Sequence, residues 1–409
     1  MAKEKLKVKE ELLEPSINID AHTSEEDYNK IKKELYRYAD PNYLDHSSDE
    51  NKVLKVRNLS VGFLTHGKKI NVIRNISLDV IKGETLAIVG ESGSGKSVFT
   101  KTFTGMLEDN GFISGGEILF RNPKTNEFDD ISKYKSNKDW QKIRGRRIAT
   151  IFQDPMTSLN PLLTIGFQIA EVLQIHHGFN KKDAKEEAIK ILERVQIPDA
   201  RNRYNDYPYQ YSGGMRQRVV IAIALACRPE ILICDEPTTA LDVTVQSQIL
   251  QLIKDLQKEF GWTTIFITHD LGVVANVADR VAVMYGGQVV EYGTCDEVFY
   301  NPAHPYTWAL LQSLPQLGSK EEPLHHIKGN PPTFLTEIVG EAFAPRNEFA
   351  MNIDFIVDPP MFKISDTHFA KTWLLDPRAP KVKKPKVIRE LKKRMEIASE
   401  ELKREVNTE

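Results

Sequence analysis

The run Gly90-Glu-Ser-Gly-Ser-Gly-Lys-Ser97 constrains the fold of this chain more than any other stretch. It follows an apolar run, residues 84–90, that predicts a buried strand, and it precedes residues 97–107, which have a helical pattern. Glycines between a strand and a helix let backbone amides close around phosphate oxygens, and the helix N-terminus adds partial positive charge. An ordinary glycine-rich turn would not require the final lysine and serine. The sequence therefore predicts a phosphate-binding loop, with Lys96 on nucleotide phosphates and Ser97 on Mg²⁺.

The composition of the 409-residue chain is that of a soluble protein. The formal net charge is -2 and 27% of residues are charged, so no overall field points to nucleic acid. No apolar run approaches the roughly 18 residues of a membrane span, and the charged start lacks a signal core. Cys227, Cys234 and Cys295 are widely spaced and lie in apolar segments, which predicts reduced thiols and a cytosolic location.

The segment before the loop combines a charged extension with two strands. Residues 1–52 carry only scattered apolar positions, which predicts a flexible extension with one short helix near residues 27–38. Residues 53–63 and 72–80 alternate in polarity and predict an antiparallel pair. Phe63 ends the first strand, where it could stack on a base or pack in the core; both alternatives remain open.

After the loop, strands alternate with a helical segment. Residues 115–120 and 147–152 predict two strands around a polar surface insertion, residues 121–139. Residues 165–195 have helical spacing, including a charged helix at residues 181–194. We therefore expect a mostly helical subdomain that interrupts the sheet.

Two further motifs carry charge or free amides. Asp235 and Glu236 end an apolar strand, and adjacent buried carboxylates require a compensating cation such as nucleotide-bound Mg²⁺. Upstream, Tyr211-Ser-Gly-Gly-Met-Arg-Gln-Arg218 predicts a helix that extends to residue 226 and is capped by Ser212, so its first amides can approach an anion. Residues 263–268 predict another strand, followed by His269.

Together these motifs resemble those of the nucleotide-binding subunit of an ATP-binding cassette (ABC) transporter, across roughly residues 53–300. P-loop kinases and GTPases lack the Ser-Gly-Gly signature between the loop and the acidic strand. The resemblance implies an α/β P-loop NTPase fold with an antiparallel β subdomain, a helical subdomain at about residues 154–226 and a small C-terminal domain at 301–378. A basic helical tail would follow at residues 379–409, with Val387, Leu391, Met395 and Leu402 at near-helical spacing. A solvated amphipathic helix is the favoured interpretation of this tail, and contact with anionic lipid beside the transporter is the alternative.

The resemblance also implies ATP hydrolysis with Mg²⁺. Glu236 would polarise the attacking water, His269 would contact the γ-phosphate, and Lys96 and Gln153 would complete the catalytic set. Ser97, Gln153 and Asp235 would supply the oxygen ligands of Mg²⁺. The nucleotide would contact Phe63, Gly90, Glu91, Ser92, Gly93, Ser94, Gly95, Lys96, Ser97, Val98, Gln153, Ser212, Gly213, Gly214, Asp242 and His269, the signature and Asp242 acting on the ATP site of a second cassette.

Residues 152–161, 211–219, 235–243 and 301–307 resemble the oligopeptide and dipeptide permease group. Met156-Thr-Ser158 and Met215 resemble its OppD-type member rather than the OppF-type one. The resemblance implies a peripheral subunit at the cytoplasmic face of the cell membrane that powers oligopeptide uptake. Its partners would be two membrane-spanning permease subunits, an OppF-type ATP-binding subunit and an extracellular peptide-binding protein, with no nucleic acid. Dipeptide or nickel import and a soluble ABC-type ATPase of DNA repair or translation remain alternatives. Leu159, Pro161 and Leu162 would suit a groove for a permease helix or, equally, the subdomain core.

OppD-type subunits often carry a four-cysteine iron-sulfur motif after the cassette, and residues 340–354 resemble that region. The corresponding positions here are Glu341, Asn347, Asp354 and Thr372, whose oxygen atoms do not replace thiolates. We therefore expect no iron-sulfur cluster, and a C-terminal domain held instead by packing. The residues expected in that packing are Phe343, Phe349, Met351, Phe362 and Trp373.

Overall fold

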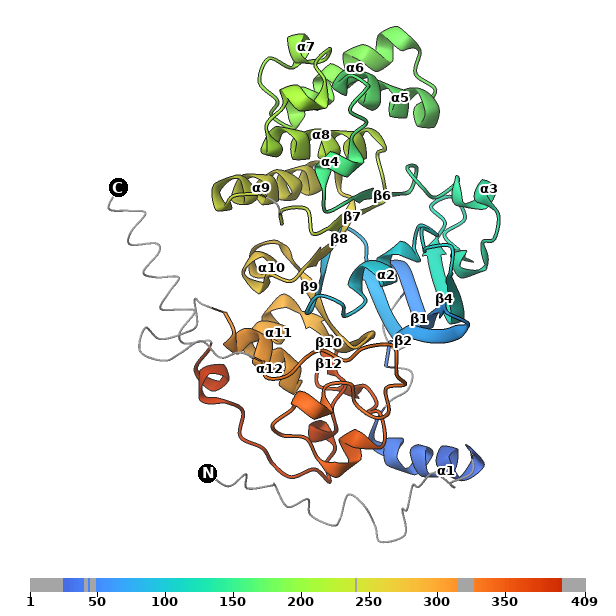
Figure 1. The fold of residues 1–409 in the computed structure, drawn as a ribbon, viewed down its shortest axis with the longest axis vertical. Coiled ribbons are helices and arrows are strands. Elements are labelled where there is room, and N and C mark those ends of the chain that lie inside the picture. Colours follow the sequence, from blue (N-terminus) through green and yellow to red (C-terminus); the bar gives the residue numbers. More distant parts are fainter. Residues whose placement is uncertain (1–24, 40–42, 45–48, 240, 315–326, 392–409) are drawn as a thin grey trace, which may run out of the picture.

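The computed structural model describes residues 25–39, 43–44, 49–239, 241–314 and 327–391. These residues form two sheets, with helices α5–α8 at one end of the molecule and the C-terminal segment at the other (Figure 1). The elements in chain order are α1 (Glu25–Leu35), η2 (Tyr36–Tyr38), β1 (Lys52–Thr65), β2 (Lys68–Ile81), β3 (Thr85–Val89), α2 (Lys96–Lys101), β4 (Gly111–Arg121), β5 (Phe128–Asp130), η3 (Ile131–Lys133), α3 (Asn137–Trp140), β6 (Ile148–Ile151), α4 (Pro155–Ser158), α5 (Ile165–His177), α6 (Lys181–Arg194), α7 (Ala200–Arg203), η4 (Pro208–Gln210), α8 (Gly213–Ala226), β7 (Ile231–Asp235), α9 (Val243–Phe260), β8 (Thr263–Thr268), α10 (Leu271–Val277), β9 (Arg280–Tyr285), β10 (Gln288–Thr294), α11 (Cys295–Tyr300), α12 (Pro305–Gln312), η6 (Ala344–Arg346), η7 (Asn352–Phe355), β11 (Phe362–Lys363), β12 (Phe369–Ala370) and η8 (Trp373–Leu375).

The smaller sheet is antiparallel, in the order β2-β1-β4-β5. The alternating patterns of β1 and β2 bury one face of this sheet, including Leu54, Val56 and Leu59, against α2 and the larger sheet. Both strands are longer than their patterns predict, and register shifts interrupt their pairing, as β-bulges do in long twisted strands.

The larger sheet has the order β11-β12-β10-β9-β3-β8-β7-β6. Strands β9, β3, β8, β7 and β6 are parallel, and β10, β12 and β11 complete the sheet in antiparallel fashion. All residues of β3 and β8 are buried. Such continuous burial is expected for parallel strands that are covered on both faces, and it explains why neither sequence alternates between exposed polar and buried apolar residues.

The helical subdomain lies between β6 and β7 and comprises α4 to α8. Its core buries apolar residues from each of the long helices α5, α6 and α8. The charged helix predicted at residues 181–194 is α6, which begins where the Asn180 side chain caps two backbone amides. Leu159 belongs to this core, whereas Pro161 is exposed and Leu162 is 82% exposed, so the three residues do not act as one set.

Helix α2, which follows the predicted phosphate loop, ends at Lys101 rather than at residue 107 as predicted. The hydroxyl groups of Thr102 and Thr104 donate to the carbonyls of Phe99 and Lys101, at 2.5 and 3.3 Å. These local hydrogen bonds compete with continuation of the helix.

The N-terminal extension was expected to be flexible, but residues 25–38 pack on the C-terminal segment. Helix α1 lies beside that segment in Figure 1, and the fully buried Leu35 contacts a cluster that contains Met351, Val357 and Trp373. The pattern of the extension predicted the helix but not its burial, since the partner residues are more than 300 positions away in the sequence.

The described start of the C-terminal tail is also not solvated, contrary to the favoured interpretation. Residues 386–391 are helical, and Ile388 and Leu391 are buried in the cluster of α11 and α12. Met395 and Leu402 lie outside the described residues. Four of the residues expected to hold the C-terminal domain are buried and the fifth packs against a buried cluster, as predicted: Phe343, Met351, Phe362, Trp373 and, partly buried, Phe349.

Two smaller predictions concern the thiols and the membrane. Cys227 and Cys234 are buried free thiols, and Cys295 is a partly buried one. In the part of the chain that the structure describes, no helix combines the length and the apolar character needed to cross a bilayer.

We expect Leu35→Ala to lower the free energy of unfolding by about 2–4 kcal/mol, because it leaves a cavity against Met351 and Trp373 that cannot collapse. Denaturant unfolding of the full chain measures this change. The exposed Lys33 on the same helix provides the control, and Lys33→Ala should change the stability by less than about 0.5 kcal/mol. Equal stability of the Leu35 variant and the parent chain would show that α1 is not part of the folded core.

Candidate active site

The predicted motifs meet at one edge of the larger sheet. Gly90 follows β3, Gln153 follows β6, Asp235 ends β7 and His269 follows β8. These four strands are neighbours and parallel. Their carboxyl ends therefore lie at the same edge, which is where ligands bind in open α/β sheets.

The loop after β3 begins at a position that only glycine can occupy. Gly90 has φ +152°, and a Cβ atom there would lie 2.1 Å from the carbonyl oxygen of Met284. Close contact with β9 thus fixes where the loop leaves the sheet. On the far side of the loop, Gly287 N–H donates to Ser94 O at 3.1 Å, so the β9–β10 turn supports it as well.

The Lys96 side chain lies inside this loop and binds its backbone. Its ammonium donates to the carbonyls of Gly90 at 2.8 Å and Glu91 at 3.0 Å, and only 5% of the residue is exposed. Burial lowers the pKa of Lys96, while Glu236, Asp235 and Glu91 oppose that shift. A buried ammonium held by carbonyl oxygens, inside a glycine-rich loop at the start of a helix, fits the phosphate groups of a nucleotide.

Ser97 and Asp235 form a pair suited to a hard cation. The Ser97 hydroxyl donates to Asp235 Oδ1 at 3.0 Å, which joins the start of α2 to the end of β7. Burial raises the pKa of Asp235, and the neighbouring Glu236 adds to the rise, while Ser97 and Lys96 oppose it. A carboxylate that is costly to ionise here is stabilised by a divalent cation, and hydroxyl and carboxylate oxygens are ligands that Mg²⁺ accepts.

Glu236 is the point at which the motifs converge. His269 Nδ1 lies 3.3 Å from its Oε1, and Gln153 Nε2 donates to its Oε2 at 3.3 Å. Thr239 Oγ1 donates to the same Oε2 at 3.0 Å, a contact that sequence analysis missed because Thr239 lies between two motifs. Glu236 also has φ +47°, an uncommon conformation for a residue with a side chain and typical of strained functional positions.

The signature and Asp242 lie together but not at the phosphate loop. Ser212 caps α8 by accepting from Met215 N–H at 3.3 Å, and Asp242 caps α9 by accepting from Val245 N–H at 2.9 Å. Gly214 packs against Val245, where a Cβ atom would lie 2.7 Å from the valine side chain. Among the described residues no hydrogen bond or ion pair links Ser212, Gly213, Gly214 or Asp242 to the loop.

The remaining predicted nucleotide contacts lie in or beside the loop. Phe63 is on β1, opposite Ile70 and Gly111, and it is half-buried, so stacking and packing both stay compatible with its place. The loop residues Ser92 and Gly93 are exposed, whereas Ser94 is buried and Gly95 and Val98 are partly so. The Glu91 carboxylate accepts two hydrogen bonds from Arg346, a contact that sequence analysis did not predict.

The four positions that align with the iron-sulfur motif are buried. The Glu341 carboxylate lies 2.9 Å from His304 Nε2, and Glu341 N–H donates to the Asp354 carbonyl at 2.7 Å. Burial raises the pKa of Glu341 to about 7 and that of Asp354 to about 9, where the nearby Glu341 adds to the rise. Asn347 and Thr372 are neutral, and no thiol is among the four. This site therefore does not fit an iron-sulfur cluster, and among the described residues no group of His, Cys, Asp and Glu is arranged to hold a metal ion.

The raised pKa values predict that stability falls as the pH rises. Above about pH 4 the unfolded chain loses the protons of both carboxyl groups, whereas the folded state keeps them on Glu341 and Asp354. The free energy of unfolding therefore falls between about pH 4 and pH 9, as the pH rises through the folded-state pKa values. Burial lowers the pKa of His304 to about 4, so this residue does not change its charge between pH 7 and 9 and does not contribute to the pH dependence there. In this window we expect Asp354→Asn to flatten the pH dependence of the unfolding free energy by about 1 kcal/mol per pH unit. Parallel curves for the variant and the parent chain would contradict the assignment.

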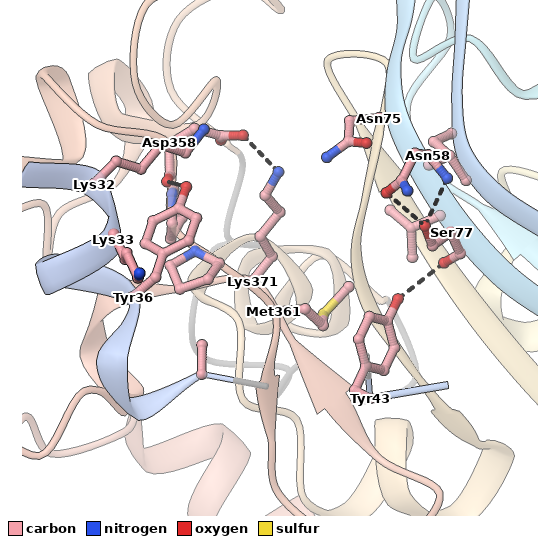
Figure 2. A pocket seen from close by; sticks show the side chains of 15 residues that line it. Lys32, Lys33, Tyr36, Tyr43, Asn58, Asn75, Ser77, Asp358, Met361 and Lys371 are labelled. Carbon is pink, nitrogen blue, oxygen red and sulfur yellow. Dashed lines mark hydrogen bonds and ion pairs between the residues drawn. The ribbon is translucent and has the colours of Figure 1, made fainter. Parts of the chain in front are cut away.

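A cavity of about 420 Å³ lies apart from these motifs, where α1, the smaller sheet and the C-terminal segment meet. Figure 2 shows that Lys371 points to Asp358 and that Tyr43 points to Ser77. Lys371 Nζ donates to Asp358 Oδ2 at 2.5 Å, and the Tyr43 hydroxyl donates to the Ser77 carbonyl at 3.0 Å. None of the predicted site residues lines this cavity. It marks the junction between the N-terminal helix and the rest of the chain.

Comparisons with known proteins show the family of the chain. The ABC transporter family matches residues 73–239, and the family described as oligopeptide/dipeptide transporter, C-terminal region, matches residues 290–353. The oligopeptide transport ATP-binding protein AmiE of Streptococcus pneumoniae is 59% identical over 345 residues, which cover 84% of this chain and 96% of that protein. The oligopeptide transport ATP-binding protein OppD of Bacillus subtilis is 54% identical over 340 residues, 83% of this chain and 93% of that protein.

A solved structure shares the fold of the cassette. The dimeric ATP-binding cassette MJ0796, in a post-hydrolysis state bound to ADP and Pi, has a TM-score of 0.52 and 28% identity. The match covers 59% of this chain and 98% of that one.

Proposed function

Because the chain belongs to the ATP-binding cassette proteins of oligopeptide and dipeptide transporters, we propose that it hydrolyses ATP to power oligopeptide uptake through separate membrane subunits. The observation that carries the catalytic part is the position of Glu236, held by His269, Gln153 and Thr239 beside the Ser97–Asp235 pair. The relatives are transport proteins, which favours transport over DNA repair or translation.

We assign the chemical roles from these contacts. Glu236 accepts a proton from the attacking water, and His269 orients Glu236 and contacts the γ-phosphate. Lys96 and the loop amides hold the phosphates. Ser97 and Asp235 would hold Mg²⁺, with Gln153 at its edge; when bound, this ion supplies positive charge that offsets the charge of the phosphates.

A complete ATP site requires a second cassette. Ser212, Gly213 and Gly214 present the N-terminus of α8 outward, with Asp242 beside them, and none of them contacts the loop of its own chain within the described residues. The dimeric form of the similar cassette MJ0796 supports this arrangement. An OppF-type subunit is our proposed partner, so that each signature completes the site of the other chain.

The surface beside Gln153 is the proposed docking site for the membrane subunits. Phe152 is 37% exposed and Met156 is 59% exposed, next to a cavity of about 430 Å³ between β6 and α8. An apolar opening of this kind accepts an amphipathic helix, here a cytoplasmic helix of a permease subunit. Gln153 then links the docking surface to Glu236. The chain would thus lie at the cytoplasmic face of the membrane, in a complex with two permease subunits and an extracellular peptide-binding protein.

The test is transport by the reconstituted complex. Proteoliposomes that contain this chain, its partner cassette, both permease subunits and the binding protein should accumulate labelled oligopeptide only with ATP inside. The isolated chain should hydrolyse ATP poorly. Uptake of a dipeptide or of nickel without uptake of oligopeptide would replace the substrate assignment, and full turnover by the isolated chain at any protein concentration would refute the shared site.

A further inference from the structure

The side chain of Glu91, the second residue of the phosphate loop, is bound by an arginine from the C-terminal segment. Arg346 Nη1 donates to Glu91 Oε2 at 2.5 Å, and Nη2 donates to Oε1 at 3.0 Å. The two residues are 255 positions apart in the sequence. Parallel hydrogen bonds of this kind combine charge attraction with a fixed orientation of both groups.

Arg346 has no freedom to leave this position without losing further contacts. Nη1 also donates to Tyr285 Oη at 3.0 Å, Nε donates to Lys328 O at 3.0 Å, and Nη2 also donates to Ile327 O at 3.3 Å. These contacts use all five N–H groups of the guanidinium. The side chain is 6% exposed, so water does not compete effectively for these bonds.

The backbone of Glu91 is held from the same side. Its N–H donates to the hydroxyl of Tyr306 at 2.8 Å, and Tyr306 is fully buried on α12 against Tyr285, with ring centroids 4.5 Å apart. The Gly90 carbonyl, which belongs to the same peptide group as the Glu91 N–H, accepts from Lys96 at 2.8 Å. The segment after the cassette therefore fixes the peptide group that also positions the phosphate-binding lysine.

Charge gives this contact a second effect. Glu91 is close enough to Lys96 to oppose the lowering of its pKa, so its negative charge is felt where phosphates bind. A carboxylate without its cation at this point would repel ATP. Arg346 neutralises this charge through the Glu91 side chain, and its five N–H groups go to partners other than the loop backbone.

We propose that Arg346 is a positioning residue for nucleotide binding, by which the C-terminal segment orients the start of the phosphate loop and neutralises Glu91. The inference rests on the proposed function only in that the loop binds ATP. It assigns to the C-terminal segment a part in the nucleotide site, although no atom of Arg346 needs to touch the nucleotide.

Binding of Mg²⁺-ATP to the full-length chain, measured by calorimetry, tests the proposal with four variants. We expect R346Q to raise the Kd about tenfold, since it leaves the Glu91 charge unpaired. E91Q alone gives the reference for the double variant, which should bind ATP more tightly than R346Q because the charge that Arg346 neutralises is then absent. R346K, which keeps the charge but not the five contacts, should lie between the parent chain and R346Q.

The matched control is another arginine–carboxylate pair in the cassette. Arg147 donates to Glu230 at 2.6 and 3.1 Å, at the opposite edge of the sheet, before β6 and β7. R147Q removes a similar pair, so it should leave the Kd for ATP within about twofold. A comparable loss in R147Q would mean that general destabilisation explains the effect of R346Q.

Two results would contradict parts or all of the proposal. Equal losses in R346Q and in the double variant would overturn the neutralising role, and an unchanged Kd in R346Q would overturn the proposal as a whole. If R346Q does not fold, R346K decides: weaker ATP binding by R346K than by the parent chain supports the proposal, and an unchanged Kd contradicts it. A parent chain that does not bind ATP would instead count against the proposed function.

Discussion

Replacing Glu236 by glutamine lowers the ATPase rate of the assembled transporter by about 100-fold or more and leaves ATP binding intact. The amide keeps the shape of the side chain and can still contact His269 and Thr239. It cannot take a proton from water, and loss of a general base typically costs 10²- to 10⁴-fold in rate. Nucleotide binding depends instead on Lys96 and the loop amides.

Steady-state ATPase rates of the reconstituted complex, together with equilibrium ATP binding, check this expectation. Thr239→Val is the informative companion variant, since it removes one hydrogen bond to Glu236 and leaves the carboxylate in place. Its rate should fall by much less than that of the glutamine variant. A near-normal rate for Glu236→Gln would show that Glu236 does not act on water.

Lys96→Ala has its largest effect on a different quantity, the affinity for ATP. The lysine is buried, its ammonium donates to the Gly90 and Glu91 carbonyls, and residues 90–97 contain no second lysine or arginine that could substitute for it. Hydrogen bonds to charged groups contribute about 1.5–3 kcal/mol, which corresponds to a loss of affinity of roughly 10- to 100-fold.

Calorimetric titration of the isolated full-length chain with Mg²⁺-ATP measures this loss, and it needs no partner subunit. Lys101→Ala is a suitable control, because Lys101 ends the same helix but pairs with the exposed Glu108. Its affinity should match that of the parent chain. Retained affinity in Lys96→Ala would contradict the phosphate-binding role of the loop.

The parts of the fold that could be predicted from the sequence are those set by local pattern. The apolar run before Gly90 became β3, and Asn180 and Ser212 mark the starts of α6 and α8 as helix caps do. The motif residues at the strand ends could also be brought together by reasoning alone, because parallel strands place their carboxyl ends at one edge.

The parts that could not be predicted depend on contacts between distant segments. Nothing near Glu91 indicates that its partner is Arg346, and nothing near Leu35 indicates burial against Trp373. Leu159 and Leu162 are the same residue type three positions apart, yet Leu159 is 4% exposed and Leu162 is 82% exposed. The local sequence pattern predicts whether a segment is a helix or a strand. Which of its residues are buried depends on the distant segments that pack against it.

Because β12 pairs with β10, the larger sheet can be completed only late in the synthesis of the chain. Glu291 of β10 pairs with Ala370 of β12, so β10 gains its second neighbour only after residue 370 has left the ribosome. Until then one side of β10 offers unpaired N–H and C=O groups, which readily pair with strands of other nascent chains. A cassette expressed only to residue 300 would keep this open edge permanently, and soluble expression of the cassette alone would suffer for that reason.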